Sequence, residues 1–312
     1  MDLRQLRYFA QIVESGSLSK AARILFVAQP ALSQQIAKLE GEVGKPLLDR
    51  TTRGVTPTEN GLALYHHAKF MLRQLDQALK IARQEAGGLQ GMVSIGLPST
   101  TVAALGLPLV KALSEKYPGI LVNVIEGLSG HLGQMMRLGQ LDLAVLFAPD
   151  PSGQSHAAPL LEEELFVILP MKSPLFPASR ETITLAEVAE LPLILPAGVH
   201  GLRRRVSAAF ESQNLTPKVV CEIDSLSLLM DCVYEGMGAT IKPMSALHQE
   251  RHRTAEWRAL SISDARLRRR NYLLSVAPDR LSPAAVAVAT ELRETTVRLV
   301  NSGEWRGVSL RT

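Results

Sequence analysis

Residues 17–58 constrain the fold of this chain most, because their centre, residues 29–40, has the pattern of one short amphipathic helix between turns. Proline at the second position suits a first helical turn, where its missing N–H would have no partner. Apolar residues at spacings of four and three share one face: Leu32, Ile36 and Leu39. The other side carries Ser33, Gln34 and Lys38. This polar face predicts contact with DNA, because Gln and Ser hydrogen-bond to base edges and Lys contacts phosphate.

The flanking segments predict the rest of a helix-turn-helix followed by a β-wing. Residues 3–13 carry apolar side chains at helical spacing, and this first helix ends near Ser15 and Gly16. Ser17 is a good N-cap for a second helix over residues 18–25, and a turn over 26–28 separates it from the helix at 29. Two short strands, 47–50 and 54–57, surround residues 51–53, which places Arg53 near the tip of a wing.

A long helix is predicted to begin after Thr58, which caps it. Its apolar positions follow heptad spacing: Leu64, Ala68, Met71, Leu75 and Ala78. Such a seam indicates a coiled coil that pairs two copies of the chain. The alternative is a helix packed on its own domain. Residues 84–88 look like a linker rather than a core, which favours pairing.

The basic excess of the chain lies entirely at its start. Residues 1–90 hold 12 Lys and Arg against 8 Asp and Glu, whereas residues 91–312 hold 22 of each kind, so the net charge of +4 belongs to the first 90 residues. A basic module on a neutral body suggests a polyanionic partner for the first part only.

A different pattern starts at Gly91. Strands are expected at 92–97, 120–126 and 141–146, with helices over 102–116 and 129–138 between them, and this βαβαβ rhythm predicts a parallel sheet covered by helices on both faces. Further strands are expected near 164–169, 193–195, 218–223, 239–242 and 271–276, and helices near 200–213, 225–235 and 282–300. This α/β stretch is too long for one small sheet, so it predicts two lobes.

Several classes of protein do not fit the sequence. No apolar run of 18 residues appears, and the first residues do not resemble a signal peptide, so neither a membrane span nor export is expected. Cys221 and Cys232 cannot make a disulfide framework, and buried, inert thiols in a reducing cytoplasm are expected. The chain lacks the spacing of a zinc site, a phosphate-binding glycine loop and a nucleophile elbow, so no metal, no cofactor and no enzyme activity are expected.

The first third of the chain resembles LysR-type transcriptional regulators at many ordered positions. The matching segments are LRQLRYF at 3–9, SGSLSKAA at 15–22, AQPALSQQI at 28–36, LE at 39–40, PLLDR at 46–50 and RGVTPTENG at 53–61. Leu48 stands where the family often has Phe, which is a conservative change. The resemblance extends more loosely to about residue 300. Within the family, residues 28–35, 53–59 and 91–97 resemble the nitrogen assimilation control branch.

This resemblance implies an α/β protein with an all-α winged helix-turn-helix N-terminal domain and a two-lobed, periplasmic-binding-protein-like C-terminal domain. The implied boundaries are 1–58 for the DNA-binding domain, 59–90 for the dimerisation helix and linker, and 91–312 for the effector-binding regulatory domain. Two strands would link lobe one, 91–161 with 267–301, to lobe two, 162–266. The implied partners are double-stranded promoter DNA with a T-N11-A type site, RNA polymerase, a small-molecule effector, and further copies of the chain in a homodimer or homotetramer.

The resemblance also implies which residues contact DNA. Those expected at base edges are Gln29, Pro30, Ser33 and Gln34. Gln34 stands where some relatives have Arg or Lys, and Gln prefers adenine where Arg prefers guanine, so base preference cannot be copied from relatives. Arg53 is expected in the minor groove or on phosphate. Lys38 and Arg50 are either phosphate contacts or ordinary surface charges.

The effector site is implied after the first and third strands of the regulatory domain and at helix starts of the second lobe. The corresponding residues are Ser99, Thr100, Thr101, Phe147, His200 and Ser227. Hydroxyls and free N–H groups at a helix start can bind an anion, but residues 99–101 are equally readable as an N-cap without a ligand. His200 is either a ligand group or a helix cap. The two arginine triplets, 203–205 and 268–270, are expected to be solvated surface, since successive residues cannot face one ligand.

Three functions remain to be compared. The first is a LysR-type regulator that activates or represses transcription, whether it responds to an effector or acts without one, as the nitrogen-control likeness suggests. The second is a small-molecule binding protein in which DNA binding is secondary. The third is an α/β enzyme, for which the sequence offers no catalytic constellation.

Overall fold

The structure is a computed structural model that describes residues 1–51, 54–82, 88–149, 153, 155–177, 179–198, 200–250, 256–276 and 281–311. The chain forms two compact units. The first comprises Met1–Gly91 with the short segment Met135–Leu141, and the second comprises Met92–Gln134 with Asp142–Thr312. No helix of the described residues is long and apolar enough to cross a membrane.

The first unit begins with three helices around a small apolar core: α1 Leu3–Ser15, α2 Leu18–Ile24 and α3 Gln29–Val43. Asp2 caps α1 through a capping box with Gln5, and the Ser17 side chain accepts a hydrogen bond from Lys20 N to cap α2. Gly16 ends α1 in the left-handed conformation that glycine favours. The core between the helices is formed by Phe9, Ile12, Ala21, Leu32, Ile36 and Leu39, with others.

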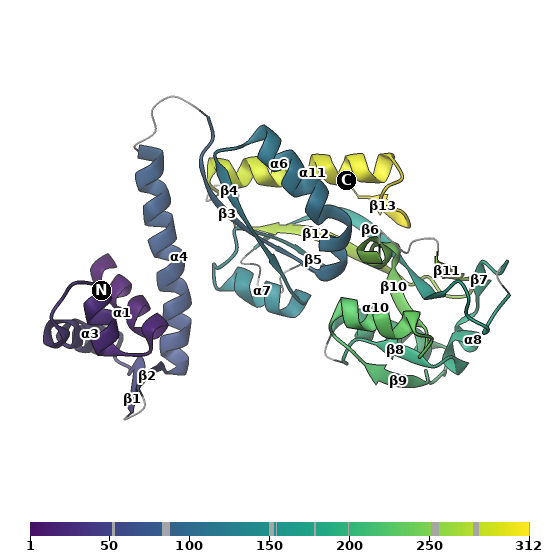
Figure 1. Cartoon of the computed structure of the whole chain (residues 1–312), viewed down its shortest axis with the longest axis horizontal. Coiled ribbons are helices and arrows are strands. Elements are labelled where there is room, and N and C mark those ends of the chain that lie inside the picture. The colour runs from purple at the N-terminus through teal and green to yellow at the C-terminus, as the bar shows by residue number, and fades with distance from the viewer. Residues whose placement is uncertain are drawn as a thin grey trace. The chain divides into compact units, whose positions relative to one another are not determined.

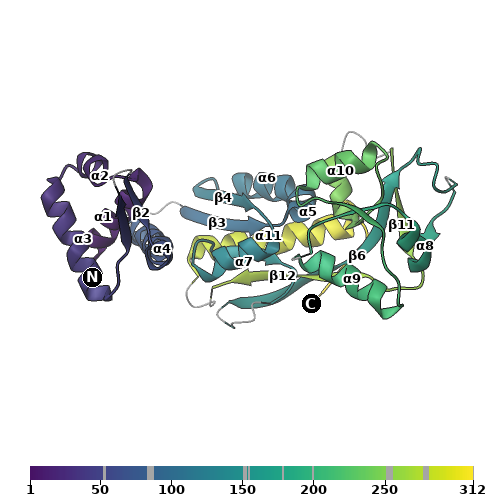
Figure 2. The same ribbon diagram turned by 90° about the horizontal axis from the view of Figure 1, so that it is seen from below.

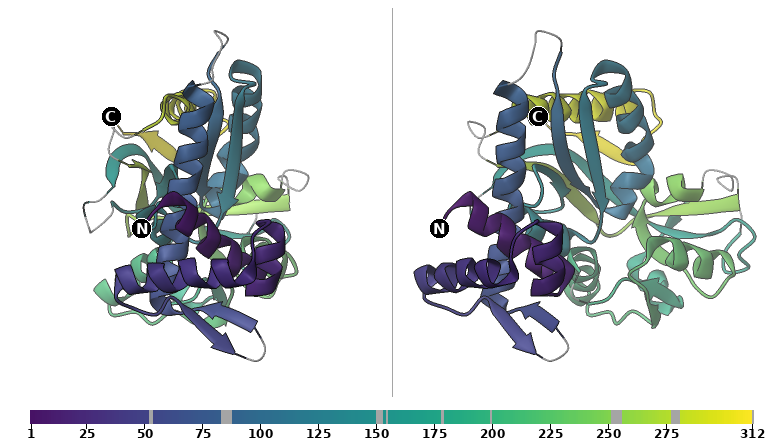
Figure 3. Two further views of the ribbon diagram at one scale, coloured as in Figure 1. Left: turned by 90° about the vertical axis from the view of Figure 1, so that its left-hand side faces the viewer. Right: turned by 60° about the vertical axis from the view of Figure 1, so that its left-hand side comes forward.

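A two-stranded wing and a long helix complete this unit. Strand β1 Leu48–Thr51 pairs antiparallel with β2 Gly54–Pro57, and Figure 3 shows this hairpin projecting away from the helices. Helix α4 Glu59–Ala82 follows, and the Thr58 hydroxyl accepts from Gly61 N at 3.0 Å as its cap. The first turns of α4 pack on the three-helix core, because Leu64 and Tyr65 are partly buried against it (Figure 1).

The first lobe of the second unit is built on a mixed sheet of β4 Ile120–Glu126, β3 Gly91–Leu97, β5 Leu143–Leu146, β12 Arg268–Ser275 and β6 His156–Pro170, in that order. Strands β3 and β5 are parallel, as the βαβαβ rhythm predicts. Strand β12 runs antiparallel to both β5 and β6, so the complete sheet is mixed rather than parallel as predicted. The sheet receives β12 from the far end of the chain, a pairing that no local pattern encodes.

Helices cover both faces of this sheet (Figure 1). A continuous helical run covers one face: α5 Ser99–Thr101, a π-helical segment Val102–Gly106 and α6 Leu107–Lys116. Helix α11 Pro283–Asn301 packs beside it, and α7 Ser129–Arg137 lies on the other face. The short strand β13 Val308–Leu310 pairs with β6. The apolar core of lobe one therefore combines residues 93–161 with residues 273–305.

The second lobe has two apolar cores on opposite faces of its strands. Its elements are β7 Thr182–Ile183, α8 Leu185–Glu190, β8 Leu193–Leu195, α9 Gly201–Ser212, β9 Val219–Glu222, α10 Leu226–Tyr234, β10 Thr240–Pro243, the 3-10 helix Met244–Glu250 and β11 Trp257–Ile262. Leu165 and Val167 of β6 pack toward α9, whereas Ile168 packs toward α10. Figure 2 shows α9 and α10 on opposite sides of these strands, as the alternation of side chains along β6 requires.

Strand β6 is the structural link between the lobes, because it pairs with β12 along residues 156–164 and with β10 and β11 along residues 165–170. Four elements of lobe two have no counterpart in the sequence-based expectations: β7, α8, the 3-10 helix Met244–Glu250 and β11. The predicted domain boundaries stay a prediction, although the change of apolar core near residues 161–165 agrees with the expected lobes.

Candidate functional site

Helix α3 presents the polar face that the sequence predicts. Leu32, Ile36 and Leu39 are buried, and the exposed side holds Gln29, Pro30, Gln34 and Lys38. Ser33 is half-buried at the edge of this face. Ala28 occupies the N-cap without a side-chain hydrogen bond, so the first turn of α3 keeps free backbone N–H groups. Such a turn can donate to phosphate while the neighbouring side chains reach base edges.

Arg50 and Glu40 hold the wing against α3. Arg50 Nη1 donates to Ser33 Oγ at 3.2 Å, and its Nη2 lies 3.8 Å from Glu40 Oε2. Glu40 Oε1 in turn accepts from the backbone N–H groups of Leu47 and Leu48, at 2.8 and 3.2 Å. Arg50 is expected from the sequence to be either a phosphate contact or an ordinary surface charge. In the structure it ties β1 to α3 while its side chain stays 42% exposed, and a phosphate contact stays a prediction. Sequence reasoning missed the positioning role of Glu40, which has no local signal.

Two sequence predictions on this unit have different outcomes. Arg53 lies outside the described residues. Of the seam positions, Ala68 is buried, Leu64, Met71 and Leu75 are half-buried, and Ala78 is exposed. Leu64 packs on the chain's own helical core, and Lys69 binds Glu14 of α1 at 2.5 Å. The first turn of the predicted seam therefore packs on the helical core of its own chain. Pairing of two copies through the rest of α4 stays a prediction.

A buried ion pair lies where the lobes are joined. Arg269 of β12 and Glu163 of β6 are cross-strand partners, and Arg269 Nε donates to Glu163 Oε2 at 2.7 Å with the two side chains only 5% and 1% exposed. Asn271 Nδ2 donates to the same oxygen at 3.1 Å, and Ser245 Oγ donates to Glu163 Oε1 at 2.8 Å. The carboxylate therefore joins β12 to the 3-10 helix of lobe two.

Arg269 also contacts two of the residues predicted to bind an effector. Its Nη2 donates to Thr100 Oγ1 at 2.6 Å, and its guanidinium carbon lies 3.8 Å from the centroid of the Phe147 ring. A cation over an aromatic face at this distance is attractive. The structure thus brings Thr100 and Phe147 together, as predicted, around a side chain that the sequence analysis assigned to solvated surface. That assignment holds for Arg268 and Arg270 and is wrong for Arg269, because alternate residues of β12 face opposite sides.

The lobe-two residues of the predicted site form a second group. His200 Nε2 lies 3.0 Å from Asp224 Oδ1, and Asp224 also accepts from Ala197 N at 2.9 Å. The backbone N–H of Ala197 and, next, the His200 side chain lower the pKa of Asp224. His200 stands at the N-cap position of α9, in agreement with its cap alternative, although its side chain makes no cap hydrogen bond.

The remaining predicted residues lie close in sequence to these groups. Ser99 is half-buried, and Thr101 is buried with no hydrogen-bond partner for its hydroxyl oxygen among the described residues. Pro98, which has no hydroxyl, stands at the N-cap of α5, so the side-chain cap alternative for residues 99–101 is wrong. Ser227 is exposed on the first turn of α10, with its Oγ 3.2 Å from Ser225 Oγ. Cys221 and Cys232 are free and half-buried rather than fully buried.

Lys242 of β10 is a site residue that sequence reasoning missed. It is 7% exposed, and no hydrogen bond or ion pair joins its Nζ to any residue in the described part of the chain. The pKa of Lys242 is lowered to about 8, first because burial disfavours the charged amine and next because the Arg269 guanidinium repels it, while the Asp224 carboxylate opposes the shift. Lys242 therefore interacts electrostatically with both groups, the one around Arg269 and the one around Asp224. These two groups and Lys242 are called the interlobe site below. Strongly shifted groups of this kind concentrate at functional sites.

Replacing Lys242 with methionine is expected to stabilise the protein at pH 7. The unfolded chain holds the lysine proton up to its ordinary pKa of 10.5, whereas the folded chain releases it near 8. Wild-type stability should therefore rise between about pH 8 and 10.5, and Lys242→Met should gain about 3 kcal/mol at pH 7 and lose that rise. Guanidinium denaturation followed by the fluorescence of Trp257 and Trp305 measures both effects. Lys218→Met, at an exposed lysine of the same lobe, is the matched control, and a less stable Lys242→Met protein would contradict the argument.

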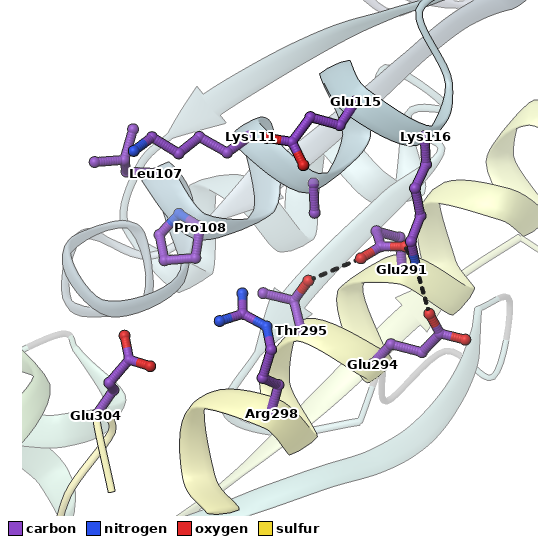
Figure 4. Close-up of a pocket in the computed structure, with 11 residues that line it drawn as sticks. Leu107, Pro108, Lys111, Glu115, Lys116, Glu291, Glu294, Thr295, Arg298 and Glu304 are labelled. Carbon is purple, nitrogen blue, oxygen red and sulfur yellow. Dashed lines mark hydrogen bonds and ion pairs between the residues drawn. The ribbon is translucent and has the colours of Figure 1, made fainter. Parts of the chain in front are cut away.

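A separate groove of about 590 Å³ lies between α6 and α11 of lobe one (Figure 4). Three of its charged side chains pair with one another. Lys116 Nζ lies 2.6 Å from the buried Glu291 carboxylate and 2.9 Å from Glu294, and these two acceptors raise the pKa of Lys116. Thr295 donates to Glu291 at 3.1 Å. The groove is therefore an ion-pair network that joins two helices.

Comparison with known proteins identifies both parts of the chain. The family model described as "Bacterial regulatory helix-turn-helix protein, lysR family" matches residues 3–62, and the model "LysR substrate binding domain" matches residues 86–296. The "Nitrogen assimilation regulatory protein nac" of Klebsiella aerogenes is 40% identical over 289 residues, which cover 92% of this chain and 93% of that relative.

Solved structures agree with this result. An OxyR mutant of Corynebacterium glutamicum matches with a TM-score of 0.61 and 27% identity over 97% of this chain and 95% of that one. CbnR, solved in complex with its target DNA, matches with a TM-score of 0.54 over 95% of this chain and 100% of that one, and at 21% identity this likeness shows the fold alone. The chain belongs to the LysR family and is a LysR-type transcriptional regulator.

Proposed function

We propose that this regulator reads promoter DNA through the exposed face of α3, with one copy of the helix in each half-site. The observation that carries the proposal is the combination of a buried face, Leu32, Ile36 and Leu39, with an exposed polar face that begins at Gln29. The wing, held to α3 by Arg50 and Glu40, would contact the backbone beside it. A symmetric pair of such helices reads half-sites about one helical turn apart.

The test uses full-length protein and a duplex that it selects from a random-sequence pool. The double variant Gln29→Ala with Ser33→Ala is expected to lose about 1–3 kcal/mol of discrimination at one or two positions of each half-site. Gln134→Ala, at an exposed glutamine of α7, is the matched control and should select the wild-type sequence. If the double variant also selects the wild-type sequence, α3 is not the reading helix.

The same proposal covers assembly and action. Two chains would pair through the exposed part of α4, and two such dimers would form a tetramer that bends DNA and alters the access of RNA polymerase. The chain would work in the cytoplasm by binding alone, without catalysis. Analytical ultracentrifugation with and without the selected duplex tests the assembly.

We further propose that the interlobe site takes a small anionic effector. Lys242 supports this proposal, because it is a buried cation without a hydrogen-bond partner among the described residues, and the positive charge of Arg269 acts on it. An anion there would compensate the buried charge. A ligand at one hundred times its Kd should stabilise the folded protein by about 2.7 kcal/mol, which a thermal-shift screen of small carboxylic acids detects. Lys242→Met should remove the response.

A second candidate is a regulator of nitrogen assimilation that needs no effector. Arg269 favours it, since this side chain already contacts Thr100 and Phe147, and the likeness to the Klebsiella protein favours a role in nitrogen assimilation. Promoter activation by purified protein without any added effector, together with no stabilising acid in the screen, would support this candidate and exclude the proposal of an anionic effector.

A further inference from the structure

The turn between α2 and α3 holds the most exposed large apolar side chain that the structure describes. Phe26 is 96% exposed, and Ile24, two residues before it, is 47% exposed. An isolated exposed apolar residue is ordinary on a protein surface. A complete phenyl ring in water is less so, and here it lies three residues before Gln29, the first residue of the reading helix.

The backbone of Phe26 is also unusual. Its φ is +55°, and in the described part of the chain only Asn214 shares a positive φ among residues other than glycine. Val27 N donates to Ala22 O at 3.0 Å, so Phe26 takes the left-handed position that ends a helix and normally holds glycine or asparagine. A bulky side chain is disfavoured in this conformation by contact between its Cβ and the backbone.

Neither the exposed ring of Phe26 nor its left-handed backbone stabilises the isolated protein. Asparagine or glycine at position 26 would relieve the backbone, and any polar side chain would relieve the exposure. Strain of this kind persists where the side chain has a use outside the folded monomer. The nearest intermolecular contact is the one proposed for the N-terminal turn of α3, and the first residues of a reading helix are those that approach base edges.

We infer that Phe26 is a further specificity-determining residue, whose ring packs on the C5-methyl group of a thymine at the edge of each half-site. This inference rests on the proposed docking of α3 in the major groove. The thymine methyl is the only apolar group that a base pair presents there, and phenylalanine is one of the side chains that recognise it. The contact would bury the ring and leave the left-handed backbone unchanged.

The experiment compares full-length wild type with Phe26→Asn on the selected duplex. Asn suits the left-handed backbone, so the variant should be at least as stable in thermal denaturation, while its affinity for DNA should fall roughly 5- to 10-fold. Each thymine of the half-site is then replaced by deoxyuridine, which lacks only the methyl group. At one position, a replacement in a single half-site removes one methyl group and should weaken wild type about 4-fold, while leaving Phe26→Asn unaffected, so the two losses do not add.

Three outcomes would overturn the inference. The first is that Phe26→Asn binds like wild type. The second is that the variant binds more weakly and yet responds to every deoxyuridine as wild type does. The third is that it changes the oligomeric state in sedimentation with its half-site preference intact, which would make Phe26 a contact between copies. The double variant at Gln29 and Ser33 separates the two proposals. If that variant loses discrimination while Phe26→Asn does not, α3 reads DNA and only the role of Phe26 is wrong.

Discussion

Replacing Glu163 with glutamine is expected to destabilise the regulatory domain by about 3–5 kcal/mol, since the buried Arg269 would lose its only anionic partner within hydrogen-bond distance in the described structure. The shape of the side chain is nearly kept, so the loss reports on charge rather than on a cavity. Both tryptophans of the chain, Trp257 and Trp305, lie in this domain, in different lobes. Their fluorescence during guanidinium denaturation therefore measures the loss without interference from the DNA-binding unit.

Glu162→Gln is the matched control for this prediction. Glu162 pairs with Arg268, Arg270 and Arg311, whose side chains are about half-exposed, and water can take over their solvation when the carboxylate is lost. The hydrogen bond from Arg311 is the main reason that the pKa of Glu162 is lowered. Equal losses for the two substitutions would mean that burial of the Arg269 pair does not set its energetic importance.

The second large effect is expected for Gly61→Ala at the start of α4. A Cβ at Gly61 would lie 1.9 Å from the backbone oxygen of Leu47, which also accepts a hydrogen bond from Thr58 N. Backbone cannot move aside as the end of a side chain can, so the wing and α4 must separate. The expected loss is about 3 kcal/mol in the unfolding of the DNA-binding unit, together with weaker DNA binding.

Gly41→Ala provides the matched control within the same unit. Gly41 lies in α3, and nothing comes within 4 Å of a Cβ built there, so the substitution should stabilise the helix by about 0.5–1 kcal/mol. Thermal unfolding followed by circular dichroism at 222 nm measures both variants, and tryptophan fluorescence should not change in either. A Gly61→Ala protein as stable as wild type would show that the junction of wing and α4 is not rigid.

Neither substitution, Gly61→Ala or Glu163→Gln, removes a residue that is proposed to contact DNA. Gly61 and Glu163 lie outside the proposed reading face, yet each fixes a group that the proposals use. Gly61 lets α4 approach the start of the wing, and Glu163 holds Arg269 against Thr100. A fall in DNA affinity for Gly61→Ala is thus expected as a loss of positioning rather than of a contact with DNA.

Most of the DNA-binding unit could be predicted from the sequence, because its determinants are local. The spacing of Leu32, Ile36 and Leu39 assigns the two faces of α3, and the N-caps Ser17 and Thr58 mark helix starts that the structure confirms. Resemblance to the LysR family, carried by contiguous motifs, is confirmed by the family models. What local pattern did not reveal is the left-handed backbone of Phe26, since the residue type argues against that conformation.

The interlobe site depended on tertiary structure. The sequence contains Glu162-Glu163-Glu164 and Arg268-Arg269-Arg270, but only the pairing of β6 with β12 sets them opposite one another, residue for residue. The alternation of strand side chains then buries the middle pair and exposes the outer arginines. Lys242 owes its shifted pKa to the same packing.

The sequence by itself determined the family, the two faces of α3 and the order of the helices and strands up to residue 82, because helix periodicity, caps and contiguous motifs act over a few residues. Only the tertiary structure decided that Arg269, Glu163 and Lys242 are buried together. Burial changes the free energy of a charge far more than any neighbour in sequence does. It is set by strands that lie about one hundred residues apart, since Arg269 and Glu163 are separated by 106 positions.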